Sequence, residues 1–139
     1  MQWKDEFKIG IPIIDTQHKQ LFLCENELSA ALTKGLRPAA IDNFLTQLGF
    51  YVTRHFSMEE HYMEQSSYPG LSEQLEAHRS FALRFTEIQE EFIQTGLNPS
   101  VVHAIQNELS AWLKNHVLGL DLTFGAYYQE KKREKNTQP

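Results

Sequence analysis

The sequence predicts an all-α fold: an antiparallel up-down-up-down four-helix bundle with a short C-terminal helix. Apolar residues recur three and four positions apart in four separate stretches, which is the spacing of one helix face. No stretch alternates between apolar and polar residues as a half-buried strand does. The breaks between the stretches are short, and short connections make neighbouring helices antiparallel. Because 139 residues is the length of one domain, residues 1–139 are expected to form a single bundle.

The first three expected helices have clear start and stop signals. Their inward-facing stripes span residues 14–32, 41–62 and 71–92. Asp15 or Thr16 is the expected N-cap of the first helix. Segments rich in Gly and Pro follow each stripe, at residues 35–38, 66–70 and 95–99, and end the helices there.

The fourth stripe spans residues 102–116 and is expected to be interrupted around Gly119. A shorter amphipathic helix over residues 122–133 follows, and its Phe124 and Tyr128 are expected to pack back on the bundle. The basic residues at its end are interpreted as a solvated helix terminus.

Composition and charge exclude several classes of protein. With 13 Lys and Arg against 18 Asp and Glu, the net charge is −5, which argues against a nucleic-acid surface. The single cysteine, Cys24, cannot form an internal disulfide, so a reducing, cytoplasmic location is expected. The N-terminal residues do not resemble a signal peptide, and no apolar run is long enough to span a membrane.

The inward stripes carry histidine and carboxylate where leucine would stabilise a core better. All four helices place an imidazole on the inward face, and the second adds a carboxylate one turn after its histidine: His18, His55, Glu59, His78 and His116. Any one of these histidines alone is more often an ordinary core residue than a ligand. Together they would leave costly unsatisfied groups without a metal. His61 and His103 lie off the stripes and are expected on the surface.

Asp121 completes the set only if the fourth helix departs from ideal geometry. It lies five residues after His116, about 140° away around an ideal helix. A break at Gly119 would turn it toward the same centre.

The donor set indicates the kind of metal. Imidazoles and carboxylates without a nearby thiolate favour iron or manganese over a cysteine-type zinc site. Two divalent cations, two carboxylates and a bridging hydroxide leave a charge of only +1 to bury, which favours a dinuclear centre. None of the six histidines has a glutamate three residues before it, so a ferritin-like carboxylate oxidase site is disfavoured.

The chain resembles the bacterial hemerythrins. The resemblance rests on the motifs Asp15-x-Gln17-His18, His55-Phe56-x-x-Glu59-Glu60 and Trp112-Leu113-x-x-His116-x4-Asp121, and covers nearly the whole chain. It implies a non-haem di-iron centre with a bridging oxo or hydroxo group, at which O2 binds end-on to one iron. It further implies that His18 and His55 hold the O2-binding iron, and that Glu59 and Asp121 bridge. His116 and two histidines of the third helix would hold the other iron.

The third helix departs from this pattern because it carries one histidine where the family has His-x3-His. In the register that keeps the family's loop spacing, His78 takes the second position and Gln74 the first. In the other register, His78 comes first and Ala82 second. We prefer the first, since a glutamine amide oxygen is a possible metal ligand. Weaker binding of the second iron follows, and at the extreme only one iron remains.

The function expected is reversible oxygen binding, for storage, delivery or transport, rather than catalysis. Phe56, Trp112 and Leu113 lie next to the expected ligands and are candidates for an apolar O2 pocket. The open alternatives are a di-iron or mono-iron redox protein that consumes peroxide, nitric oxide or Fe(II), and an oxygen or redox sensor. The expected partner is O2 or another small diatomic ligand. The sequence does not indicate a particular protein partner or an oligomeric state.

Overall fold

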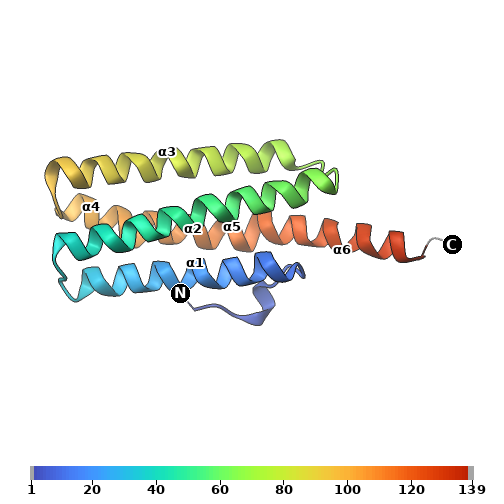
Figure 1. Ribbon diagram of the computed structural model, residues 1–139, viewed down its shortest axis with the longest axis horizontal. Coiled ribbons are helices and arrows are strands. Elements are labelled where there is room, and N and C mark those ends of the chain that lie inside the picture. The colour runs from blue at the N-terminus through green and yellow to red at the C-terminus, as the bar shows by residue number, and fades with distance from the viewer. Residues whose placement is uncertain (1, 138–139) are drawn as a thin grey trace.

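The computed structural model describes residues 2–137, which contain helices and no strand. A short 3-10 turn, η1 (Asp5–Phe7), precedes three long helices, α1 (Pro12–Thr33), α2 (Pro38–Gln65) and α3 (Leu71–Thr95). The fourth rod consists of α4 (Pro99–His103), η2 (Ala104–Leu109), α5 (Ser110–His116), η3 (Val117–Asp121) and α6 (Leu122–Thr137). The four rods lie side by side in an antiparallel bundle, which confirms the predicted fold (Figure 1).

The first helix begins earlier than the sequence predicts. Pro12, whose fixed φ suits the first turn, follows the extended residue Ile11, so neither Asp15 nor Thr16 is the N-cap. Asp15 instead accepts hydrogen bonds from the backbone N–H groups of Ile9 (2.7 Å) and Gly10 (3.2 Å). Its carboxylate therefore fixes the N-terminal arm against α1.

The fourth rod is continuous where the sequence predicts a break. Residues of η2 and η3 form π-helical segments, in which each N–H bonds to the carbonyl five residues earlier. Gly119 lies inside η3 without a positive φ, so the chain does not turn there. The expected interruption is thus wrong, and an inserted residue in the helical ladder takes its place.

The last helix, α6, begins at Leu122 as the sequence predicts, and it ends at Thr137, four residues later than predicted. Phe124 is fully buried, and Tyr128 packs against the same cluster of apolar residues, which contains Ile14 and Met63. Figure 1 shows α6 continuing past the ends of the other three long helices, and residues 129–137 are exposed. None of the helices within residues 2–137 combines the length and apolar character needed to cross a bilayer.

Candidate metal centre

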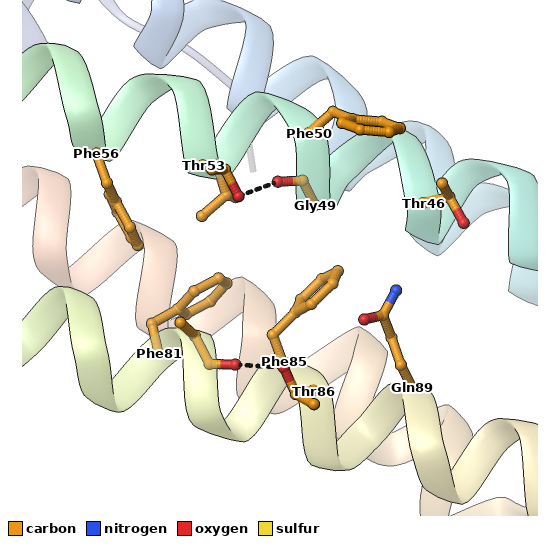
Figure 2. Close-up of a pocket in the computed structure, with 11 residues that line it drawn as sticks. Thr46, Gly49, Phe50, Thr53, Phe56, Phe81, Phe85, Thr86 and Gln89 are labelled. Atoms are coloured by element: carbon orange, nitrogen blue, oxygen red, sulfur yellow. Dashed lines mark hydrogen bonds between the residues drawn. The ribbon is translucent and has the colours of Figure 1, made fainter.

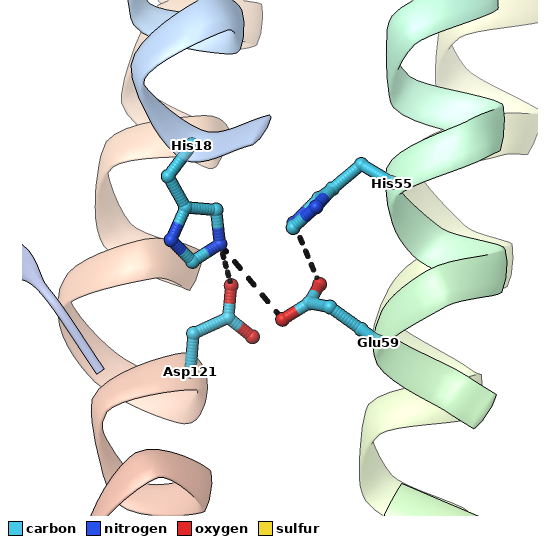
Figure 3. Close-up of side chains that lie close together, drawn as sticks. All are labelled: His18, His55, Glu59 and Asp121. Carbon is cyan, nitrogen blue, oxygen red and sulfur yellow. Dashed lines mark hydrogen bonds and ion pairs between the residues drawn. The ribbon is translucent and has the colours of Figure 1, made fainter. Parts of the chain in front are cut away.

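One group of four buried side chains comes from three rods. His18 of α1, His55 and Glu59 of α2, and Asp121 at the end of η3 point toward one another (Figure 3). Nε2 of His18 lies 3.0 Å from Oδ2 of Asp121 and 3.9 Å from Oε2 of Glu59. Nε2 of His55 lies 2.8 Å from Oε1 of Glu59. The four ligand atoms all lie within 4.8 Å of one another, the spacing expected around a single cation.

A second group shares Glu59 and adds the third helix. Nε2 of His78 lies 3.5 Å from Oε1 of Glu59 and 3.2 Å from Nε2 of His116. Since ligand-to-cation distances are near 2 Å, two ligands of one ion lie roughly 3 Å apart. The separation of the two imidazole nitrogens therefore fits a shared cation.

The two carboxylates lie between the two groups. Asp121 directs Oδ2 toward His18 and Oδ1 toward His116, at 3.2 Å from the His116 Nε2. Glu59 directs Oε1 toward His55 and His78, and Oε2 toward His18. Each carboxylate thus reaches both histidine pairs, which is the arrangement that two bridged cations require.

η3 brings Asp121 into the centre. On an ideal α-helix its side chain would lie about 140° away from that of His116. The i-to-i+5 ladder of a π-helical segment places residue 121 above residue 116 instead. The measured 3.2 Å between the two side chains is the result.

Several buried polar atoms of the centre have no hydrogen-bond partner within the part of the chain that the structure describes. They are His18 Nδ1, His55 Nε2, both carboxylate oxygens of Glu59, and Gln74 Oε1. His55 Nε2 and Glu59 Oε1 are close, yet their directions do not make a hydrogen bond. Buried polar atoms without partners are costly. Of these atoms, His55 Nε2 and the Glu59 oxygens bring their lone pairs together without a donor, and this arrangement fits a bound cation.

Electrostatics point the same way. Burial lowers the pKa of His18, and it lowers the pKa of His55 to about 4, so both imidazoles are in the neutral form that binds metals. Burial and the nearby Asp121 charge raise the pKa of Glu59 well above its usual value. Burial also opposes ionisation of Asp121, but hydrogen bonds from His116 and His18 hold its pKa well below the usual range. Two buried carboxylates that resist joint ionisation are a site for positive charge.

Comparison with known proteins decides the family. The family described as "Hemerythrin HHE cation binding domain" matches residues 9–127. The chain belongs to the hemerythrin family. A bacteriohemerythrin from Stenotrophomonas maltophilia is 32% identical over 122 residues, covering 88% of this chain and 77% of that protein. A bacteriohemerythrin from Clostridium acetobutylicum is 31% identical over 130 residues, covering 86% of this chain and 94% of that protein. The myohemerythrin of Riftia pachyptila is 26% identical over 127 residues, covering 88% of each chain. Membership implies a non-haem iron centre of the hemerythrin type.

In this hemerythrin, Gln74 lies where the preferred register of the third helix predicts it. Its side chain is 1% exposed, and Nε2 donates a hydrogen bond of 3.1 Å to Oδ1 of Asp121. The amide oxygen Oε1 is the atom left free for another interaction. Ala82, the position of the alternative register, is exposed and lies away from the centre, beside Phe85 and Thr86.

Two residues that orient the histidines were not identified from the sequence. Glu60 Oε2 lies 2.7 Å from Nδ1 of His78, and Gln17 Oε1 lies 3.0 Å from Nδ1 of His55. A carboxylate or amide oxygen can only accept, so Nδ1 carries the proton and Nε2 presents its lone pair to the centre. Both partners follow or precede a ligand directly in the sequence, but their histidines lie 18 and 38 residues away, so spacing gives no signal.

Two of the three apolar residues predicted to line an O2 pocket, Phe56 and Trp112, lie against the second group. Phe56 stacks on His78 with ring centroids 3.8 Å apart and planes at 7°. Trp112 stacks on His116 at 4.5 Å and 11°. Leu113 is buried in the core next to α1. His61 and His103 are exposed, as predicted.

Proposed function

We propose that this hemerythrin binds O2 reversibly at a di-iron centre held by the two side-chain groups. Seven residues would be the ligands, with Glu59 and Asp121 as bridges and Gln74 contributing its amide oxygen: His18, His55, Glu59, Gln74, His78, His116 and Asp121. The observation that carries the proposal is the shared pair of carboxylates, which lies between two histidine pairs and of which Glu59 has both oxygens without a hydrogen-bond partner. Bound iron would supply the redox-active metal at which O2 is held, with a bridging oxo or hydroxo group between the ions.

The surroundings favour binding over catalysis of an organic reaction. Aromatic rings stack on His78 and His116, and apolar contacts slow the entry of water and the loss of charged oxygen species. Within residues 2–137, the polar side chains seen to converge on the centre are ligand candidates or orient them. We therefore propose an oxygen-binding protein, with Phe56, Trp112 and Leu113 as its pocket and residues 1–139 as one domain. We also propose that the protein is cytoplasmic, because Cys24 is a free thiol and free thiols persist in the reducing cytoplasm.

Iron content and the optical spectrum test this function together. Iron per chain is measured after anaerobic reconstitution, and spectra are recorded before and after adding and removing O2. Two irons per chain with a charge-transfer band that appears and disappears reversibly support the proposal. Oxidation without a reversible adduct contradicts it.

A second candidate function follows from Gln74. An amide in place of an imidazole is a weaker donor, so the iron between His78 and His116 would be held less firmly and keep an open position. Such a site would consume peroxide, nitric oxide or Fe(II), and a single-iron form is its extreme. Turnover of one of these compounds without a stable O2 adduct would favour this candidate over oxygen carriage.

Gln74→His tests whether residue 74 faces the metal. We expect the variant to release iron to a chelator on the order of tenfold more slowly, because an imidazole replaces the weaker amide. Gln47→His, an exposed position on α2, is the matched control. Equal release rates in the variant and the unaltered protein would remove Gln74 from the ligand set.

A further inference from the structure

A groove between α2 and α3 leads from the surface toward the centre. It encloses about 330 Å³. Figure 2 shows Phe81 and Phe85 reaching from α3 into this space, with Phe56 of α2 at one end and Thr46 and Gln89 at the other. The groove therefore has an aromatic floor at the end next to the histidines.

The lining admits only a restricted class of molecule. None of the described residues that line the groove is charged. The hydroxyl of Thr53 donates to the carbonyl of Gly49 (2.9 Å), and that of Thr86 to the carbonyl of Ala82 (3.0 Å). Because these hydroxyls already donate hydrogen bonds to carbonyls of their own helices, they are not free to donate to a polar or ionic ligand in the groove. An uncharged lining of this kind favours small uncharged molecules over ions, because a buried charge without a partner is costly.

One aromatic ring separates the groove from the centre. Phe56 is among the groove-lining residues, and its ring stacks on His78 at 3.8 Å. His78 in turn places Nε2 3.5 Å from Glu59. A change of the Phe56 rotamer, which must break its stacking on His78, would open the groove to the ligand cluster.

Gly49 keeps the groove open along its length. A Cβ at this position would lie 3.1 Å from Cε1 of Phe85, closer than ordinary packing allows. A larger residue would push the Phe85 ring across the groove. The glycine on α2 and the phenylalanine on α3 thus define its width.

The groove on the other side of α3 has different chemistry. Trp112 lines it and stacks on His116, so it too approaches the centre. Glu73, Glu76 and Arg79 also line that groove. Charged walls disfavour an apolar molecule, so the two sides of α3 are not equivalent.

We propose that the groove between α2 and α3 is a binding and admission site for small, uncharged, apolar molecules of diatomic size, with Phe56 as the gate. This proposal rests on the proposed function, since it supplies the route by which a dissolved gas reaches the histidines. Molecules would first occupy the space over Phe81 and Phe85, then pass Phe56, whose ring contacts both His55 and His78, to reach the centre.

Xenon tests the binding site without depending on oxygen chemistry. Crystals of the iron-loaded protein are pressurised with xenon, and we expect xenon density between Phe56 and Phe85. In Ala82→Trp, an indole on the groove wall should remove that density. Absence of xenon from the groove of the unaltered protein would overturn the proposed site even if O2 binding is confirmed. Xenon in the groove of a protein that binds no O2 would reject the proposed function alone.

Ligand kinetics test the admission route. Ala82→Trp on α3 and Thr53→Trp on α2 block the groove from opposite walls, and Ala77→Trp on the other side of α3 is the matched control. Stopped-flow association of O2, or of nitric oxide if no O2 adduct forms, should slow on the order of tenfold in both blocked variants. Dissociation should slow by the same factor, because a blocked route changes both rates and leaves Kd and the spectrum unchanged.

The Ala77→Trp control distinguishes the groove between α2 and α3 from the groove on the other side of α3. Ala77→Trp should leave both rates within about twofold of the unaltered protein. Slower rates in Ala77→Trp with unchanged rates in the two blocked variants would move the route to the groove under Trp112. A changed Kd or spectrum in Ala82→Trp would show that the substitution disturbs the centre rather than the route.

Discussion

At the scale of single residues, the oriented imidazoles distinguish a metal centre from a cluster of core histidines. Glu60 fixes the proton of His78 on Nδ1, and Gln17 does the same for His55. A histidine held in this way presents Nε2 without paying for reorientation when a cation arrives. We therefore expect these partners, as well as the histidines, to affect how strongly a cation binds.

Glu60→Gln should weaken cation binding by about 10- to 100-fold, the usual effect of losing a carboxylate that supports a metal-bound histidine. The neutral amide is a weaker acceptor for the His78 Nδ1 proton and no longer adds negative charge beside it. Competition with a chelator, with Co(II) as a spectroscopic substitute for iron, measures the change. Glu64→Gln, an exposed position one turn further along α2, is the control and should bind as the unaltered protein does. Equal affinities in all three proteins would contradict the role of Glu60.

Glu25 is a second buried carboxyl that the sequence analysis did not single out. It lies on α1 and is 6% exposed. Burial raises its pKa, and a hydrogen bond from Ser110 opposes the rise. The folded state then binds a proton at a higher pH than the unfolded state does. Stability therefore increases as the pH falls from the folded pKa to the unfolded value, and the cost of burying the charge is greatest above the folded pKa.

Glu25→Gln should raise the midpoint of urea unfolding at about pH 7, because it removes this buried charge while keeping an acceptor for Ser110. The gain should disappear near about pH 4, where the carboxyl is protonated in both states. The exposed Glu27→Gln on the same helix is the control and should show no such dependence. A gain in the midpoint that is the same at both pH values would mean that the buried charge is not its cause.

At the scale of elements, the periodicity of the sequence predicts the helices well because each buries one stripe of apolar residues. The ends of α2 and α3 fall where Ser66 and Gly96 follow the stripes. The same stripes place His18, His55, Glu59, His78 and His116 inside the bundle, and all five are buried. The start of α1 was not predicted correctly because Asp15, an ordinary N-cap residue, serves the N-terminal arm instead.

The π-helical segment η3 could not be predicted in this way. An extra residue in the hydrogen-bonded ladder has no characteristic composition, and its glycine suggests a break. Gly119 has neither a positive φ nor any atom within 4 Å of a Cβ built on it. The conformation of η3 therefore does not depend on the special backbone freedom of glycine.

Gly119→Ala should stabilise the protein by about 0.5–1 kcal/mol, because alanine loses less backbone entropy in a helical conformation. Its metal content should stay unchanged. Deletion of residue 119 would restore an α-helical count and place Asp121 four positions after His116, about 40° around the helix, so this variant should also keep its metal. Urea unfolding and metal content per chain measure the two effects. Loss of metal in Gly119→Ala would show that the glycine itself is required.

At the scale of the whole molecule, the polar centre lies between two apolar clusters. On one side are the core residues that include Leu21, Val52 and Leu113, and on the other are Ile14, Met63 and Phe124. Each ligand-bearing helix therefore runs from one apolar layer to the other through the centre. The two clusters hold the bundle together, so the costly buried carboxylates are kept in place whether or not a cation is bound.

Cation binding should consequently stabilise a bundle that is already folded. A cation at about 100 times its Kd adds about 2.7 kcal/mol to the free energy of unfolding. For a chain of this size, that corresponds to a rise in Tm of about 10 °C. Thermal unfolding followed by circular dichroism, with and without Co(II), measures the shift.

In His18→Ala the shift should be largely lost, because the first group loses a ligand that lies 3.0 Å from Asp121. In His61→Ala, an exposed histidine on α2, the shift should be retained. Equal shifts in the two variants would mean that the cation stabilises the surface and not the buried centre.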